Sequence, residues 1–549
     1  MNDLNSRVSV VKGILSLLLA FVLVNGLLLA PRWLSGGASA SAWIAVEAAV
    51  VVGLCAFLPR SRWALTVIAG AALMLVALTV TGLADAAARL SLARPLNLYL
   101  DLYLAGAVHN LLVGTLGSVR AALALFGAGV GVLLLALAAA HLLHRARVPA
   151  GRWSAVGIGA LLAALLSVGL WGEHVHPAAS KVALPAVDLI VEQVHYMGRM
   201  LAERETFSEE MASKRAGYSD HPGLLQRLEG RDVLLAFIES YGVTALDDPL
   251  YAPIVLPRLG DMADRLEAAG LHLASGRLVA PSQGGQSWLG HGTLLSGLWL
   301  DNQLRYELLL TSVRETLIDD FRHAGYRTVA LMPAITLAWP EGERLGFDRI
   351  FAHRDIGYAG PALNWVTMPD QFTWSYLQET VRPGGGDPRP LFATVGLISS
   401  HAPWTPILPV LDDWDAIGDG AIFAPWDGAG EPPEELWRDS DRVREHFALS
   451  IDYAVHAMTA YAERYLDEGT LLIALGDHQP APLITGDGAS QDVPVHVISG
   501  DPELLEPFLD WGFVPGAVPA SDGSARGMDA FRDWFVRAFS VSAMSTGQD

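Results

Sequence analysis

Five long apolar segments in the first third of the chain limit its possible folds more than any other feature. They lie near residues 13–30, 42–58, 64–83, 121–143 and 153–171 of a 549-residue sequence. A helix needs about 20 predominantly apolar residues to cross the hydrocarbon core of a bilayer, and each segment approaches that length. The sequence therefore predicts a five-helix transmembrane anchor over residues 1–171.

A sixth apolar segment, residues 95–117, is predicted to lie at the membrane interface or to re-enter the membrane without crossing it. It contains Asp101, His109 and Asn110, and ionisable side chains are costly at the centre of a bilayer. With five spans, the segments on the side of the N-terminus hold seven Lys and Arg against four on the other side. Cytoplasmic loops carry such an excess. We therefore expect a multi-pass protein of the cytoplasmic (inner) membrane, extracytoplasmic after residue 171.

Charge is divided unevenly between the two parts of the chain. Residues 1–171 contain eleven Lys and Arg and four Asp and Glu, a net charge of +7, so the remainder carries −28 to give the total of −21. Such acidity argues against a nucleic-acid partner, because phosphate backbones are bound by clustered Lys and Arg. The only cysteine, Cys55, lies in an apolar segment and excludes an intrachain disulfide. Glu47 lies about five residues, or roughly 8 Å, inside the outer end of the second predicted span, and we expect it to reach the interface.

Residues 172–229 are predicted to be a linker region, and residues 230–549 a catalytic domain. Residues 183–215 show helical spacing of apolar positions followed by dense charge, which indicates a linker helix. After residue 230, strand-like segments (233–239, 328–333, 391–399 and 471–476) alternate with helical ones (255–270, 311–325, 370–382, 435–467 and 525–540). This alternation predicts an α/β domain with a mostly parallel sheet between helices.

Possible metal ligands follow three of the predicted strands. Glu239 ends the first strand, His401 follows the strand at 391–399, and Asp477 and His478 follow the last. Ligands bind beyond the carboxyl ends of the strands in such sheets, and carboxylate and imidazole are common ligands of divalent metals. Each residue alone is more typical of a structural hydrogen bond or an ordinary loop. Their combination predicts a metal site.

A fourth element adds a hydroxyl group to this set. Ser287 follows a glycine-rich turn and precedes a predicted helix, in the segment GGQSWLGHGTLLSG at residues 284–297. Backbone N–H groups and the helix dipole favour an anionic group at such a position. On its own, Ser287 would be an ordinary helix cap. Together with the predicted ligands, it indicates a metal-activated serine that acts on a phosphate or sulfate ester.

Three motifs resemble those of a known superfamily. The segment SWLGHGTLLSG, which starts at Ser287, resembles the sulfatase nucleophile signature C/S-x-P-S-R-x-x-L-L-T-G in its spacing and its end. FIESYG, around Glu239, and LGDHQP, around Asp477, resemble the metal-binding segments of lipoteichoic acid synthases and phosphoethanolamine transferases. The membrane anchor before the domain is similar to that of the same transferases. The chain thus resembles the membrane-anchored, sulfatase-like branch of the alkaline phosphatase/sulfatase superfamily.

The resemblance implies a role for each site residue. Glu239, Ser287, Asp477 and His478 would bind a divalent metal ion (Mn, Zn or Mg), Ser287 would be the nucleophile, and His401 would contact the transferred group. Thr293 is the alternative nucleophile, and Trp339 corresponds loosely to an aromatic residue of the substrate pocket. Sulfatases convert the nucleophile to formylglycine with the help of Pro and Arg two and four positions later. This chain has Leu289 and His291 there, which favours an unmodified serine.

The implied function is transfer of a phosphoglycerol or phosphoethanolamine type group. The donor would be a membrane phospholipid and the acceptor an envelope glycan or lipid, because the anchor holds the domain at the outer leaflet. Two alternatives remain at this stage. One is a membrane-bound sulfuric ester hydrolase or phosphodiesterase that uses water as the acceptor, and the other is an inactive domain that only binds. The donor head group, the metal and the oligomeric state are not predicted.

Overall fold

The chain folds into two compact units in the computed structural model. The described residues are 2–35, 41–102, 106, 108, 109, 112, 113, 116–147, 181–214, 217–221, 223–521 and 525–541. One unit comprises Met1–Leu90 and Arg94–Leu201, and the other comprises Ser91–Ala93 and Ala202–Asp549.

Long apolar helices make up most of the first unit. Its helices include α1 (Asn2–Ser35), α2 (Val46–Ala56), α3 (Arg62–Leu92), α6 (Ser118–Arg145) and the start of α8 (Pro185–Ser213). Three stretches, Lys12–Ser35, Arg62–Leu92 and Ser118–Arg145, are long and apolar enough to cross a membrane. They correspond to the first, third and fourth predicted spans. The fifth predicted span, residues 153–171, lies outside the described residues.

The second predicted span, residues 42–58, contains a shorter helix than expected. Helix α2 has 11 residues and is about 16 Å long, roughly half the thickness of a hydrocarbon core. It begins late because Ile44–Ala45 (β1) is extended and pairs in parallel with Val182–Ala183 (β2). Five spans are therefore not confirmed. Glu47 in α2 accepts hydrogen bonds from the backbone N–H groups of Ala186 and Val187, at 3.0 and 3.1 Å.

The Glu47 contacts show what that carboxylate does inside an apolar segment. The first N–H groups of a helix have no partner within the helix. Glu47 supplies one for the first turn of α8, and its negative charge suits the positive end of that helix. The sixth apolar segment begins with the short helix α4 (Leu98–Asp101), in which Asp101 forms an ion pair with Arg94 at 2.7 Å. An interfacial or re-entrant position for residues 95–117 stays a prediction.

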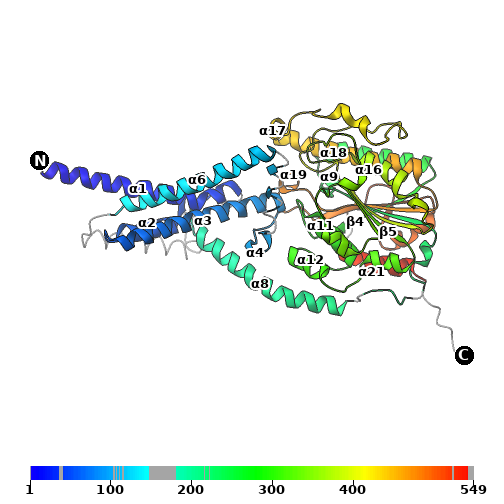
Figure 1. The fold of residues 1–549 in the computed structure, drawn as a ribbon, viewed down its shortest axis with the longest axis horizontal. Coiled ribbons are helices and arrows are strands. Elements are labelled where there is room, and N and C mark those ends of the chain that lie inside the picture. Colours follow the sequence, from blue (N-terminus) through cyan, green and yellow to red (C-terminus); the bar gives the residue numbers. More distant parts are fainter. Residues whose placement is uncertain are drawn as a thin grey trace. The chain divides into compact units, whose positions relative to one another are not determined.

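A nine-stranded sheet forms the centre of the second unit (Figure 1). Its strands are β3 (Asp232–Ile238), β4 (His272–Val279), β5 (Arg327–Met332), β6 (Arg349–Ala352), β7 (Leu391–Leu397), β8 (Thr470–Gly476), β9 (Asp492–Ser499), β10 (Val514–Pro515) and β11 (Arg526–Gly527). The order is β10-β4-β9-β8-β3-β7-β5-β6, and β11 pairs with β4. Strands β8, β3, β7, β5 and β6 are parallel to one another, whereas β9 is antiparallel to both β8 and β4. The predicted, mostly parallel sheet is thus confirmed, with an antiparallel edge that was not predicted.

The central strands end at the same level. Strand β3 lies between β7 and β8, and Ile238 pairs with Leu397 on one side and Gly476 on the other. Every residue of β7 and β8 is buried, which is typical of parallel strands that are covered on both faces. The residues that follow β3, β7 and β8 therefore emerge at one edge of the sheet.

Helices cover both faces of the sheet (Figure 1). Helices α10 (Ala252–Ala268), α16 (Asp370–Tyr376) and α18 (Ser440–Tyr465) pack on one face, and α11 (Ser287–Ser296), α13 (Leu317–His323) and α21 (Phe531–Phe539) pack on the other. The predicted helices at 435–467 and 525–540 correspond to α18 and α21. Each of these two helices starts several residues later than predicted.

A buried ion pair joins three helices on the second of these faces. Both side chains of the pair, Asp320 of α13 and Arg532 of α21, are fully buried. Arg532 donates to the two carboxylate oxygens of Asp320, at 2.8 and 3.0 Å, and to the carbonyl oxygen of Ser296 at the end of α11. Because Ser287 begins α11, this link fixes the far end of the helix that carries the predicted nucleophile.

Candidate active site

The predicted metal ligands meet beyond the carboxyl ends of β3 and β8. Glu239 follows β3, and Asp477 and His478 follow β8. Because Ile238 and Gly476 are paired across the two strands, the next residue of each strand is also adjacent. One oxygen or nitrogen atom from each of Glu239, Asp477 and His478 lies within 4.8 Å of the others. Among the described residues, this is the one group of carboxylate and imidazole side chains with such spacing.

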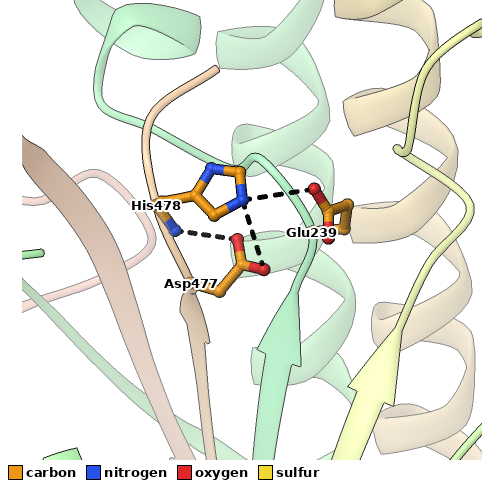
Figure 2. A group of neighbouring side chains, drawn as sticks. All are labelled: Glu239, Asp477 and His478. Atoms are coloured by element: carbon orange, nitrogen blue, oxygen red, sulfur yellow. Dashed lines mark hydrogen bonds and ion pairs between the residues drawn. The ribbon is translucent and has the colours of Figure 1, made fainter. Parts of the chain in front are cut away.

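Figure 2 shows how the three side chains face one another. His478 Nε2 lies 3.4 Å from Glu239 Oε1 and 3.8 Å from Asp477 Oδ2. The side chains of His478 and Asp477 are 1% and 3% exposed, and that of Glu239 is 13% exposed. Solvent therefore reaches the cluster mainly from the side of Glu239.

Hydrogen bonds to the backbone fix the orientation of the cluster. Asp477 Oδ1 accepts from the backbone N–H groups of Ser240 and His478, both at 2.8 Å. His478 Nδ1 donates to the carbonyl oxygen of Gln479 at 2.9 Å, which leaves Nε2 turned toward the carboxylates. Such a bond from the second ring nitrogen fixes the tautomer and orientation of a metal-binding histidine. Ser240 also donates from its hydroxyl to Glu239 Oε1 at 2.8 Å.

Ser287 brings its hydroxyl group to the same cluster. Its Oγ donates to Glu239 Oε2 at 3.2 Å and lies 3.3 Å from His478 Nε2. Ser287 is the first residue of α11, and the preceding Gln286 is in the left-handed region with φ of 64°. Helix α11 approaches the loop after β8 so closely that a Cβ atom on Gly290 would lie 2.5 Å from the carbonyl oxygen of Asp477. Gly290 thus allows the approach that brings Ser287 to the cluster.

The electrostatics of the cluster reflect two carboxylates beside one imidazole. Burial and the charge of Glu239 raise the pKa of Asp477 above its usual range. Burial also opposes ionisation of Glu239, but the positive charges of His478 and His401 outweigh it and lower the pKa of Glu239. The pKa of His478 rises to about 9, because the two carboxylates outweigh the effect of burial. The site therefore favours a cation between the carboxylates.

These residues fit a divalent metal ion. Two carboxylates, one imidazole nitrogen and one hydroxyl oxygen converge on the same small volume, and these are suitable ligands for zinc, manganese or magnesium. The carboxylates exceed the imidazole in charge, so a divalent ion would neutralise the cluster better than a proton does. Chelation also requires deprotonated ligands.

His401 lies in the loop after β7, next to the cluster. It is partly buried, and its Nδ1 donates to the carbonyl oxygen of Ala402 at 2.6 Å. The preceding Ser400 donates from its hydroxyl to the carbonyl oxygen of Glu239 at 2.5 Å. This bond joins the loop that carries His401 to the backbone of Glu239. Since Nδ1 is engaged, Nε2 is the nitrogen that remains for a ligand.

Asp370, at the start of α16, supports the His401 loop and was missed in the sequence. Its Oδ1 accepts from the backbone N–H groups of Ile398 and Ser399, at 2.7 and 2.9 Å, and the residue is fully buried. Burial raises the pKa of Asp370 to about 6. The sequence offers no motif around Asp370, and only the position of this residue at the start of a helix could have pointed to it.

Two further candidate residues, Thr293 and Trp339, make other contacts within the fold. Thr293 is fully buried in α11, and its Oγ1 accepts a hydrogen bond from the backbone N–H of Leu300 at 3.0 Å. Its hydroxyl is therefore used within the fold, which argues against Thr293 as the nucleophile. Trp339 packs against the core on the face of the sheet covered by α13 and α21.

The chain is similar to known proteins in its three-dimensional structure. No family model and no curated protein sequence matches this chain. The domain resembles solved structures of the alkaline phosphatase superfamily. One is the lipoteichoic acid synthase LtaP from Listeria monocytogenes, with 9% identity over 60% of this chain and 76% of that chain and a TM-score of 0.37.

Two other solved structures show a similar relation. The periplasmic domain of EcEptC from Escherichia coli, in complex with Zn, shares 12% identity over 58% of this chain and 85% of that chain, with a TM-score of 0.36. The phosphoglycerol transferase GacH from Streptococcus pyogenes, in complex with sn-glycerol-1-phosphate, shares 14% identity over 55% and 74%, with a TM-score of 0.33. The chemistry of this chain is inferred from its own site residues.

Proposed function

We propose that this protein is a membrane-anchored, metal-dependent phosphotransferase. It would move a phosphoglycerol or phosphoethanolamine type group from a membrane phospholipid, through an intermediate on Ser287, to a glycan or lipid of the cell envelope. The observation that carries the proposal is the position of Ser287 Oγ, at the start of a helix and 3.2 and 3.3 Å from Glu239 and His478. A serine hydroxyl among metal-binding side chains is placed to act as a nucleophile.

Each group in the site would have its own role in the reaction. Glu239, Ser287, Asp477 and His478 would hold the divalent ion, which would stabilise the serine alkoxide and the charge that develops on the phosphoryl oxygens. Ser287 begins α11, and the positive end of this helix dipole favours a phosphate group there. Tight anchoring of Asp477 and His478 to the backbone would keep the ligands in place during the reaction.

The transfer proceeds in two displacements. Ser287 Oγ releases its proton to solvent and attacks the phosphorus atom of the lipid phosphodiester, and the bond from phosphorus to the diacylglycerol oxygen breaks. Diacylglycerol leaves after it takes up a proton, for which His401 is the nearby donor. An acceptor hydroxyl then attacks phosphorus and gives its proton to His401, the bond to Ser287 Oγ breaks, and Ser287 regains a proton from solvent. Both steps exchange one P–O bond for another, so no oxidant or reductant is needed.

Substitutions in α11 test the assignment of Ser287. Ser287→Ala should lose at least about 10³-fold in turnover of a fluorescent phospholipid, because a covalent nucleophile contributes several orders of magnitude. Ser287→Thr should keep part of the activity, since it keeps a hydroxyl group. The matched control is Thr293→Ala on the same helix, which should lose much less. Near-normal turnover in Ser287→Ala with no turnover in Thr293→Ala would transfer the role to Thr293.

Whether residue 287 is a serine or a formylglycine distinguishes the proposed phosphotransferase from a sulfuric ester hydrolase. Leu289 and His291 occupy the positions at which the formylglycine signature has Pro and Arg, and Leu289 is fully buried. We therefore propose that Ser287 stays a serine. Mass spectrometry of the purified protein should give the unmodified mass for the peptide that contains Ser287. The mass of formylglycine in that peptide would favour a sulfatase.

The acceptor and the side of the membrane require separate measurements. If water were the acceptor, the free head-group phosphate would accumulate in place of a transferred product, and the protein would be a phosphodiesterase. We also propose that the second unit is extracytoplasmic. A phosphatase reporter fused after residue 214 should be active only outside the cytoplasm. Activity only in the cytoplasm would contradict the topology.

A further inference from the structure

The first unit contains a basic pocket that the proposed reaction does not use. The pocket has a volume of about 420 Å³ and is lined by Arg60, Ser61, Arg62, Leu65, His144, Arg145 and Arg147. It lies where the turn between α2 and α3 meets the end of α6. The volume falls within the range of small-molecule sites, roughly 300–1,000 Å³. We call it the basic pocket.

Arg147 forms the buried part of the basic pocket. It is 8% exposed. Its guanidinium donates to the carbonyl oxygens of Pro59 and His144, both at 3.1 Å, and its Nη2 contacts the imidazole of His144. These acceptors are neutral, so they orient the guanidinium without cancelling its charge. Burial of a charge without a counter-ion is costly.

No carboxylate offsets this charge within the described residues. The lining residues include four arginines and no Asp or Glu. Ion pairs between described residues do not involve Arg60, Arg62, Arg145 or Arg147. The partial charges at the C-termini of α2 and α6 supply about −0.5 each, which leaves most of the four positive charges uncompensated. The basic pocket therefore attracts an anion.

An unused hydrogen-bonding group points to the same conclusion. Ser61 Oγ is buried and has no hydrogen-bond partner among the described residues. Buried polar groups in folded proteins nearly always have a partner. A hydroxyl beside arginine side chains is suited to donate to a phosphate oxygen, and planar guanidinium groups bind phosphates in a bidentate manner.

The position of the basic pocket indicates which phosphate compounds can reach it. Arg62 begins α3, and Arg89, near the other end of this 31-residue helix, binds Glu192 of α8 at 2.8 Å. The basic pocket therefore lies at the end of the bundle away from α8, where apolar helices end. In the topology proposed above, this end faces the inner leaflet. Basic pockets between membrane helices on the cytoplasmic side are suited to anionic lipid head groups.

We propose that the basic pocket binds the phosphate-bearing head group of an anionic phospholipid. The acyl chains would lie along the exposed apolar surfaces of α3 and α6, which include Leu65 beside the pocket and Leu137 nearer the middle of α6. This lipid would be a bound component of the anchor, distinct from the donor consumed at Ser287. Arg147 and Ser61 would contact the phosphate at the buried base of the pocket, and the guanidinium groups of Arg60, Arg62 and Arg145 would donate hydrogen bonds to it from the pocket's rim.

The test is a lipid titration of the full-length protein in a zwitterionic detergent. The midpoint of thermal unfolding is followed against a short-chain phosphatidylglycerol, the matching phosphatidylcholine and inorganic phosphate. We expect phosphatidylglycerol alone to raise the midpoint at low concentration. Equal shifts with phosphatidylcholine would overturn the proposal. Equal shifts with inorganic phosphate would show a free phosphate site and would overturn the lipid assignment.

Three variants distinguish a pocket that binds the phosphate specifically from general attraction of anionic lipid by basic residues. Arg60→Gln/Arg145→Gln should weaken the apparent affinity for phosphatidylglycerol at least tenfold, as loss of charged hydrogen bonds requires. Arg60→Lys/Arg145→Lys keeps the charge that orients the protein in the membrane but loses bidentate geometry, and it should weaken affinity by a smaller factor. Arg120→Gln, at the exposed start of α6, is the control and should bind as wild type. Wild-type affinity in both double variants, or an equal loss in Arg120→Gln, would contradict the proposal.

Discussion

Two buried charged clusters of the second unit differ in their balance of positive and negative charge. In the pair Asp320–Arg532, both side chains are fully buried, and each carboxylate oxygen accepts a hydrogen bond from the guanidinium. In the cluster of Glu239, Asp477 and His478, two carboxylates face a single imidazole, and the pKa of Asp477 is raised. The first cluster is neutral by itself. The second keeps excess negative charge, which is costly unless a cation joins it.

The difference separates a structural role from a functional one. Arg532 also binds the carbonyl oxygen of Ser296, so the neutral pair holds helices α11, α13 and α21 together. The charged cluster lies beyond β3 and β8, which their backbone pairing already joins. Substitutions in the first cluster should therefore reduce stability, and substitutions in the second should reduce activity.

The largest expected effect is on the activity of variants in the charged cluster. Asp477→Ala or His478→Ala removes a proposed ligand of the metal, and such a metal would contribute several kcal/mol of transition-state stabilisation. About 4 kcal/mol corresponds to roughly 10³-fold in rate. Turnover of a fluorescent phospholipid measures the loss, and circular dichroism checks the fold. Asp510→Ala, at an exposed position in α20 (Glu506–Asp510), is the control. Full activity in either site variant would contradict the proposed metal site.

The next effect is on stability. Asp320→Ala leaves the guanidinium of Arg532 buried without its counter-ion and should lower the free energy of unfolding by about 3–5 kcal/mol. Denaturant unfolding of the full chain in detergent measures this change. At low temperature, the activity per folded molecule should stay close to wild type. The double variant Asp320→Leu/Arg532→Met should recover most of the stability, because it removes both charges together. A double variant as unstable as the single one would show that packing dominates.

The smallest expected effect is the response of stability to a chelator. A metal present at 100 times its Kd stabilises the folded state by about 2.7 kcal/mol, so chelation should lower the midpoint of thermal unfolding of the wild type. Asp477→Ala should show no response. Asp320→Ala should start from a lower midpoint and still respond, because its metal site is intact. If chelation lowered the midpoint of Asp477→Ala as much as that of the wild type, the metal would bind elsewhere.

Much of the second unit could be predicted from its sequence. Strands such as β3 and β8 are short, mostly apolar runs, and helices such as α18 have clear periodicity, so their types followed from pattern alone. Strands β4 and β9 were missed. Strand β4, HLASGRLV, mixes polar residues and a glycine with apolar ones, and its antiparallel partner β9 lies more than 200 residues later. Pairing at such a distance leaves no local signal.

The first unit was predicted less well. Apolar length alone indicated a span at residues 42–58, but pairing of Ile44–Ala45 with Val182–Ala183 shortens the helix to α2. Such pairing depends on a segment far along the chain. For the same reason, the contact of Glu47 with the start of α8 could not be predicted.

The sequence indicated which residues could form the candidate site, but it did not indicate the residues that support them. Glu239, Asp477 and His478 follow strands, and Ser287 follows a glycine-rich turn, so their positions in the pattern made them candidates. The structure brings these four together. Ser240 and Asp370 act through backbone contacts that depend on the folded loops, and no motif marks them.

The most direct test of the central claim is the mass of the peptide that contains Ser287 during turnover. The protein is mixed with phospholipid in the presence of a divalent metal, quenched in acid within the first turnover, digested and analysed by tandem mass spectrometry. We predict a phosphorylated head group attached to Ser287, and no such adduct in Asp477→Ala. Product that accumulates while Ser287 stays unmodified, or an adduct on Thr293, would contradict a metal-activated Ser287 nucleophile.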